Sequence, residues 1–147
     1  NFNGSYIISD EKFSEDELKL RSLGLREGET LGDSRPLQGQ SPYLINAGID
    51  YNNTDKGIRS GVYFNVQGKT LEVVGDGFYP YVYTMPFNSL NFNLTKQLND
   101  KTSLTFRVRN ILNDERESLF EGYGGTTEYF RFRNIGRTFS LGYSIKF

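Results

Sequence analysis

The side chains best suited to contact a ligand are amides, hydroxyls and guanidinium groups at every second position of three segments. They are Asn65, Gln67, Asn91, Asn93, Thr95, Arg107 and Arg109. Such groups donate and accept hydrogen bonds, and the two arginines add positive charge, but none of them is a ready nucleophile or general base. The pattern therefore predicts a hydrated lining or binding surface rather than a catalytic centre.

The residues needed for most catalytic and metal sites do not occur in this sequence. It has no His and no Cys, so Ser-His and Cys-His nucleophiles are impossible and zinc would need carboxylates alone. No pair of carboxylates is placed so as to suggest acid–base catalysis. We expect no enzyme activity, no cofactor and no metal. The formal charge of -1 also gives no reason to expect nucleic acid as a partner.

Alternation of apolar and polar residues identifies six strands, because side chains of a strand point to opposite faces in turn. The most regular one is at the end of the sequence, where Phe139, Leu141, Tyr143, Ile145 and Phe147 alternate with polar or small residues. The six segments lie at about 2–9, 43–52, 58–67, 89–95, 101–110 and 138–147. An all-β antiparallel fold is expected.

The connections between these strands alternate in length. Residues 53–57 and 99–102 are short and polar, as in hairpin turns, whereas 10–40, 68–87 and 113–128 are long. Long and short connections therefore lie at opposite ends of the sheet. Outer-membrane β-barrels have this arrangement, with short periplasmic turns and long extracellular loops.

On this interpretation the apolar positions face lipid and the polar ones face the lumen of a transmembrane β-barrel. The expected lipid-facing residues are Phe92, Leu94, Leu104, Phe106, Val108, Leu141, Tyr143 and Ile145. Alternation within one strand does not exclude the other arrangement, in which the polar residues form the solvated outer face of a soluble sheet.

Two features of the long connections stand out. Ser14, followed by Glu17 and then leucines, is typical of a helix start in which Ser14 caps the first turn and Glu17 reciprocates. One short helix is therefore expected after Ser14. The glycine-rich segment 121–125 lacks the Lys and the strand-to-helix context of a phosphate-binding loop, so we expect a loop tip there.

The alternation from Phe139 through Leu141, Tyr143 and Ile145 to Phe147 resembles the signal by which the bacterial barrel-assembly machinery recognises its clients. An unpaired strand edge can pair with the edge of the machinery, while the outward rings lie in lipid. We expect these five residues to be the assembly signal.

Several segments together resemble the C-terminal barrel region of TonB-dependent outer-membrane receptors, in the branch with a carboxypeptidase-regulatory-like N-terminal module. They are Leu-Gln-Gly-Gln-Ser-Pro-Tyr at 37–43, Met-Pro-Phe-Asn-Ser-Leu at 85–90, Arg-Asn-Ile-Leu-Asn at 109–113 and the closing strand at 139–147. The resemblance covers roughly residues 35–147 and does not include the first long connection.

This resemblance implies a barrel of about 22 strands around a plug, of which residues 1–147 would be the C-terminal six-stranded portion. The implied function is active uptake of a nutrient, such as a siderophore, vitamin, peptide or glycan fragment, in the bacterial outer membrane. Implied partners are membrane lipid, the plug and upstream strands of the same receptor, TonB through an N-terminal segment outside this chain, the assembly machinery, and a surface lipoprotein as a further candidate. The alternatives are a soluble lipocalin-like binding barrel and a barrel client captured by the assembly machinery.

Overall fold

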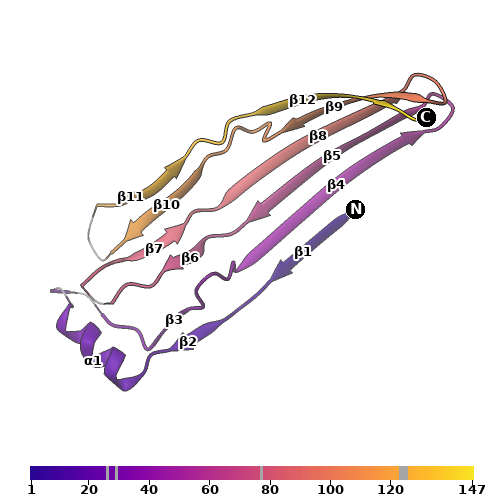
Figure 1. Ribbon diagram of the computed structural model, residues 1–147. Coiled ribbons are helices and arrows are strands. Elements are labelled where there is room, and N and C mark those ends of the chain that lie inside the picture. Colours follow the sequence, from indigo (N-terminus) through magenta and orange to yellow (C-terminus); the bar gives the residue numbers. More distant parts are fainter. Residues whose placement is uncertain (26, 29, 77, 123–125) are drawn as a thin grey trace.

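Six antiparallel strands form the main sheet of the computed structural model, which describes residues 1–25, 27–28, 30–76, 78–122 and 126–147. Their order across the sheet is β1-β4-β5-β8-β9-β12 (Figure 1). The bounds are β1 Phe2–Tyr6, β4 Tyr43–Asn53, β5 Ile58–Gln67, β8 Phe87–Gln97, β9 Thr102–Arg109 and β12 Thr138–Ile145. These strands occupy the six segments that the alternation predicts, so the expected all-β antiparallel fold is confirmed. The sheet is open, with β1 and β12 at its edges.

Shorter strands extend the main strands at one end (Figure 1). They are β2 Asp10–Lys12, β3 Ser34–Pro36, β6 Thr70–Val73, β7 Tyr81–Thr84, β10 Arg116–Glu121 and β11 Glu128–Arg133. The order β11-β10-β7-β6 makes a second sheet, and β2 pairs with β3. The ranges 68–87 and 113–128, expected as long loops, therefore contain the paired strands β6, β7 and β10. Their irregular connections are shorter, and residues 26, 29, 77 and 123–125 within the expected loops lie outside the described residues.

The two short turns close at the opposite end, as expected. In the β4–β5 turn, the Asn53 side chain accepts a hydrogen bond of 2.9 Å from the Lys56 N–H, and Gly57 has a φ of 59°. In the β8–β9 turn, Asn99 Oδ1 accepts from the N–H groups of Lys101 and Thr102 at 3.0 and 2.9 Å. An asparagine side chain of this kind replaces the strand hydrogen bonds that the turn lacks.

One short helix, α1 Glu15–Leu23, follows β2, as the sequence predicts. The Glu17 N–H donates to Ser14 Oγ at 3.2 Å, which caps the first turn. The expected reciprocal contact is replaced, because the Glu17 carboxylate accepts hydrogen bonds from Arg21 instead. At the other end the Gly24 N–H donates to the Arg21 carbonyl. Nine residues are too few for a stable isolated helix, so α1 depends on its contacts.

Few apolar side chains are buried in the part of the chain that the structure describes. Leu71, Val82 and Val108 are the buried hydrophobic residues, while large apolar side chains of the main sheet remain exposed. Backbone pairing between strands, rather than a dry core, dominates the contacts of the main sheet. No helix of the described residues is both long and apolar enough to cross a membrane.

Candidate functional site

The strand register separates the main sheet into two faces. Residues that pair directly across antiparallel strands point to the same side. One row across the sheet is Ile49, Val62, Phe92, Val108 and Phe139, and the adjacent row is Asp50, Gly61, Asn93, Arg107 and Ser140. We call the side of the first row the apolar face and that of the second row the polar face.

All seven residues that the sequence indicates as a lining surface lie on the polar face. Asn65 pairs with Ser89, Asn93 with Arg107, and Thr95 with Thr105. The Thr95 and Thr105 hydroxyls are 3.1 Å apart. Gln67, Asn91 and Arg109 occupy odd-numbered positions of the same strands and share this side. The register thus brings together residues from β5, β8 and β9.

A ladder of four asparagine side chains, joined by the Asn110 backbone N–H, crosses the polar face from strand to strand. Asn46 Nδ2 donates to Asn3 Oδ1 at 2.8 Å, and Asn65 Nδ2 donates to Asn46 Oδ1 at 2.6 Å. Asn91 Nδ2 donates to Asn65 Oδ1 at 3.5 Å, and the Asn110 N–H donates to Asn91 Oδ1 at 3.2 Å. We call these five residues the asparagine ladder. It satisfies polar groups that would be costly against hydrocarbon.

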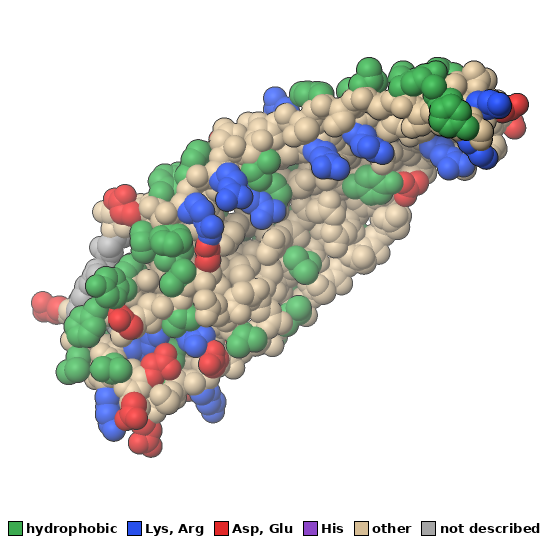
Figure 2. All heavy atoms as spheres, viewed as in Figure 1, with side chains coloured by type: hydrophobic (Ala, Val, Ile, Leu, Met, Phe, Trp, Pro, Cys, Tyr) green, Lys and Arg blue, Asp and Glu red, His purple; other side chains and the backbone are tan. Residues whose placement is uncertain are grey.

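Between the asparagine ladder and the short turns, the polar face has a hollow. An open hollow of about 530 Å³ is lined by residues that include Asp50, Tyr63, Asn93 and Arg107. The Tyr63 hydroxyl donates to the Asp50 carboxylate. Figure 2 shows a broad face of backbone and side chains that are neither charged nor hydrophobic, on which Lys and Arg side chains form a line. This surface can hydrogen-bond a polar ligand or water.

Exposed apolar side chains lie on the apolar face from β4 to β12, although Val108 on the same face is buried. Ile49, Phe139 and Leu141 expose 78%, 64% and 72% of their surface. Val62 and Phe106 are also exposed, and large exposed apolar patches are uncommon on a soluble monomer. The expected lipid-facing residues Phe92, Leu94, Leu104, Phe106, Val108, Leu141, Tyr143 and Ile145 all lie on this face.

Polar groups limit the apolar face at both ends of β8. At one end lies Asn88, whose N–H and side chain both donate to Asp114 Oδ2, at 2.6 and 3.2 Å. At the other end the Lys96 ammonium reaches the Lys56 carbonyl in the β4–β5 turn, 2.5 Å away. The aliphatic stem of a lysine can thus lie along an apolar surface while its ammonium group reaches a polar partner beyond that surface, an arrangement called snorkelling.

Tyrosine rings lie near both limits of the apolar face. Tyr6 pairs with Tyr43 at the end next to the shorter strands. Tyr51 and Tyr143 lie toward the short turns, where Tyr143 pairs with Leu104. Rings with one polar atom are typical of a boundary between an apolar and an aqueous environment.

The expected assembly signal falls on an exposed edge strand. Phe139, Leu141, Tyr143 and Ile145 share the apolar face of β12, whose only partner strand is β9 among the described residues. Phe147 follows β12, and its side chain is fully exposed. The geometry brings four of the five residues into one row, while their recognition by a partner remains a prediction.

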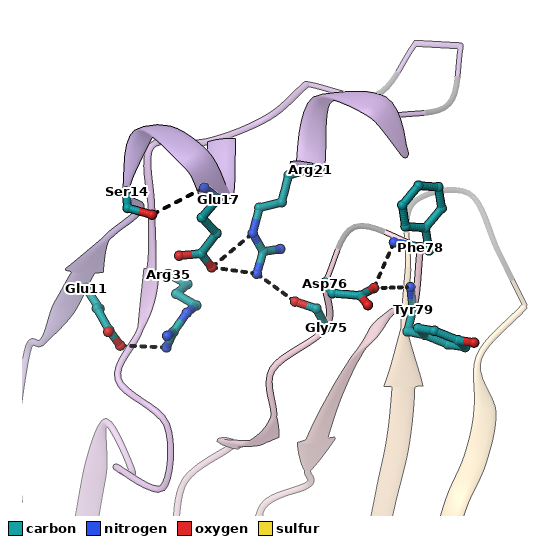
Figure 3. Close-up of polar contacts among 9 residues, drawn as sticks. All are labelled: Glu11, Ser14, Glu17, Arg21, Arg35, Gly75, Asp76, Phe78 and Tyr79. Carbon is teal, nitrogen blue, oxygen red and sulfur yellow. Dashed lines mark hydrogen bonds and ion pairs between the residues drawn. The ribbon is translucent and has the colours of Figure 1, made fainter. Parts of the chain in front are cut away.

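At the far end of the shorter strands, Arg21 joins α1 to the β6–β7 connection (Figure 3). Its side chain is only 6% exposed. Arg21 Nη2 lies 3.0 Å from Glu17 Oε1 and 2.6 Å from the Gly75 carbonyl. The guanidinium carbon also lies 4.5 Å from the Phe13 ring centroid and 5.1 Å from that of Tyr81. We call this arrangement the Arg21 clamp.

Two further properties of this end concern tyrosines and the β6–β7 tip. Burial raises the pKa of Tyr81, although the nearby Arg21 charge lowers it, and burial also raises the pKa of Tyr83. Both phenols therefore stay neutral near neutral pH. At the tip, the N–H groups of Phe78 and Tyr79 donate to Asp76 Oδ1, both at 3.1 Å, and both rings are exposed (Figure 3).

Several residues that lie on the polar face in the structure were not predicted from the sequence. The ladder members Asn3 and Asn46 follow the same alternation as Asn65 and could have been found from it. Three arginines of the β10–β11 hairpin, described below, could not, because their proximity depends on strand register. Among the described residues, no group of three or more carboxylates is arranged to hold a metal ion.

Comparisons of the chain with protein-family models, with curated proteins and with solved structures give no significant match.

Proposed function

We propose that this chain forms part of the wall of a TonB-dependent transporter in the bacterial outer membrane, which takes up a nutrient such as a siderophore, vitamin, peptide or glycan fragment. The observation that carries the proposal is the exposed apolar face opposite a hydrogen-bonded polar face. In a membrane barrel the first side contacts lipid and the second lines the lumen. The segments that resemble TonB-dependent receptors supply the transporter class.

The height of the apolar face supports a membrane setting. Asn88 and Lys96 limit this face on β8, and eight residue steps of about 3.3 Å give about 26 Å along the strand. With a tilt of about 40°, this becomes about 20 Å across the membrane, close to the apolar band of about 25 Å in outer-membrane barrels. Tyr6 and Tyr43 at one limit, and Tyr51 and Tyr143 at the other, would be the aromatic girdles.

The edges of the sheet support a share in a larger barrel. β1 and β12 each pair on one side only among the described strands, and a barrel of about 22 strands would pair both edges with further strands. The plug and the TonB-contacting segment would belong to the rest of the same receptor. In this arrangement the short turns face the periplasm, and α1 and the β6–β7 tip lie outside the cell.

Cysteine substitutions at neighbouring positions test the proposal directly, because this chain has no native Cys. In the full-length protein reconstituted in lipid vesicles, we expect a fluorophore on Phe92→Cys to be quenched by nitroxides attached to lipid tails. The same fluorophore on Asn93→Cys should be quenched by a water-soluble agent instead. Leu141→Cys and Ser140→Cys form a second matched pair on β12.

The soluble lipocalin-like alternative gives a different labelling pattern. In a soluble lipocalin-like barrel the even-numbered positions of β8 would be shielded from both quenchers inside a dry core. In that case the apolar side chains would line the interior, and the protein would be extracted without detergent. Equal quenching at positions 92 and 93 would contradict a two-faced membrane wall.

A further inference from the structure

Two like charges face one another across the β10–β11 hairpin. Arg116 and Arg133 are direct partners in the antiparallel register. Like charges in directly opposed positions repel and destabilise a strand pair. The ion pairs among the described residues include Arg131, but neither Arg116 nor Arg133. The hairpin therefore holds two guanidinium groups together without a carboxylate between them.

The two arginines line a small hollow. Its volume is about 140 Å³, and its other lining residues are Thr84, Ser118 and Arg131. The adjacent carboxylate, Glu72, is already engaged: it pairs with Arg131 and accepts hydrogen bonds from Ser118 at 2.5 Å and Thr84 at 2.8 Å. Three guanidinium groups thus meet one carboxylate, and the hollow keeps an excess of positive charge.

Phe87 places the hollow relative to the main sheet. The Arg116 guanidinium carbon lies 4.5 Å from the Phe87 ring centroid, so the charge of this exposed side chain lies over the ring. Phe87 is an odd-numbered residue of β8 and shares the polar face with Asn91. The hollow therefore opens on the polar face, at its end next to α1. Arg109 lies on the same face, and Lys and Arg side chains form a line across the face that Figure 2 shows.

We propose that Arg116 and Arg133 form a binding subsite for an anionic group, a carboxylate or a phosphate, on the ligand that passes along the polar face. The inference rests on the proposed function, since it takes the polar face to be the ligand's path. Guanidinium groups bind such anions through two parallel hydrogen bonds. An anion between Arg116 and Arg133 removes their repulsion, and Arg107 and Arg109 attract it toward the hollow.

Binding of defined anions by the full-length protein in detergent tests this subsite. Calorimetric titrations with inorganic phosphate and with citrate, at matched ionic strength, distinguish the two anion classes. We expect saturable binding of at least one probe, weakened about ten-fold or more by Arg116→Gln and by Arg133→Gln, because each loses a charged hydrogen bond. The control, Arg59→Gln, makes the same chemical change on the same face, at its end next to the short turns, and should change affinity by less than about two-fold.

A second measurement separates a ligand site from a purely structural role. Without anion, Arg133→Gln should raise the unfolding temperature because it relieves the repulsion from Arg116. Added phosphate or citrate should raise that temperature in the wild type and leave Arg133→Gln unchanged. Absence of saturable binding in the wild type, or equal weakening in Arg59→Gln, would overturn the subsite. The quenching at positions 92 and 93 reports separately on the membrane wall, so the two proposals fail independently.

Discussion

The Arg21 clamp should decide whether α1 stays attached to the rest of the molecule. In Arg21→Ala the Gly75 carbonyl loses a hydrogen bond from a charged donor, the Phe13 and Tyr81 rings lose their cation, and Glu17 loses its ion-pair partner. The first loss is worth about 1.5–3 kcal/mol, and the second about 0.5–2 kcal/mol. The Glu17 side chain is a third exposed, so solvent screens the ion pair to about 0.5 kcal/mol.

The expected sum is about 2–4 kcal/mol, after allowance for overlap between these contacts. It applies to local opening of α1 rather than to global unfolding, because the strands of the main sheet do not depend on the helix. Hydrogen exchange of amides in Glu15–Leu23 should then accelerate by about 30- to 800-fold. Mass spectrometry of peptides that cover α1 measures this directly.

Lys19→Ala on the same helix is the matched control. Lys19 also forms an ion pair, with Asp16 at 3.4 Å, but both side chains are largely exposed. Such a pair contributes little, so exchange should change by about two-fold at most. Equal protection of α1 in Arg21→Ala and in the wild type would show that the clamp does not hold the helix.

Four further outcomes follow from the two-faced sheet. Phe106→Arg should cost about 2–4 kcal/mol in urea unfolding from lipid vesicles, since a charge would enter the bilayer, and an unchanged midpoint would contradict a lipid-facing position. Asn65→Ala should cost only about 0.5–1.5 kcal/mol in the same assay, because water replaces the lost amide contacts on a hydrated face; a much larger loss would mean that this face is dry. Deletion of Phe147 should lower the amount of folded receptor in the outer membrane without lowering its heat resistance, and equal pulse-labelled levels would remove the case for an assembly signal. Protease added to intact cells should cut within 10–40 or within the tip of 113–128, whereas cleavage confined to the short turns would reverse the topology.

The strands and turns of the main sheet could be predicted from the sequence because their physical signal is local. Period-two alternation identifies a strand without knowledge of its partner, and Asn53 and Asn99 indicate turns through contacts within a few residues. Ser14 likewise indicates the start of α1. The membrane environment is a different matter, since alternation gives two faces without saying what covers each one.

Four of the shorter strands, β6, β7, β10 and β11, could not be predicted because their register is irregular. The β6–β7 pairing shifts between Leu71 and Val73, and the β10–β11 pairing shifts between Ser118 and Leu119. Each bulge interrupts the alternation, so these segments read as loops. The same dependence on pairing hides the contact between Arg116 and Arg133, and tertiary packing hides the role of Arg21.

The asparagine ladder gives the polar face one property that charged groups could not. It consists of four asparagine side chains and the Asn110 backbone N–H, none of which titrates, so its hydrogen bonds persist across the pH range and are insensitive to ionic strength. Every bond in it also donates toward β1, from Asn110 through Asn91, Asn65 and Asn46 to Asn3. Aligned amide dipoles polarise one another. The ladder is therefore an uncharged band across the polar face whose hydrogen bonds all run in one direction.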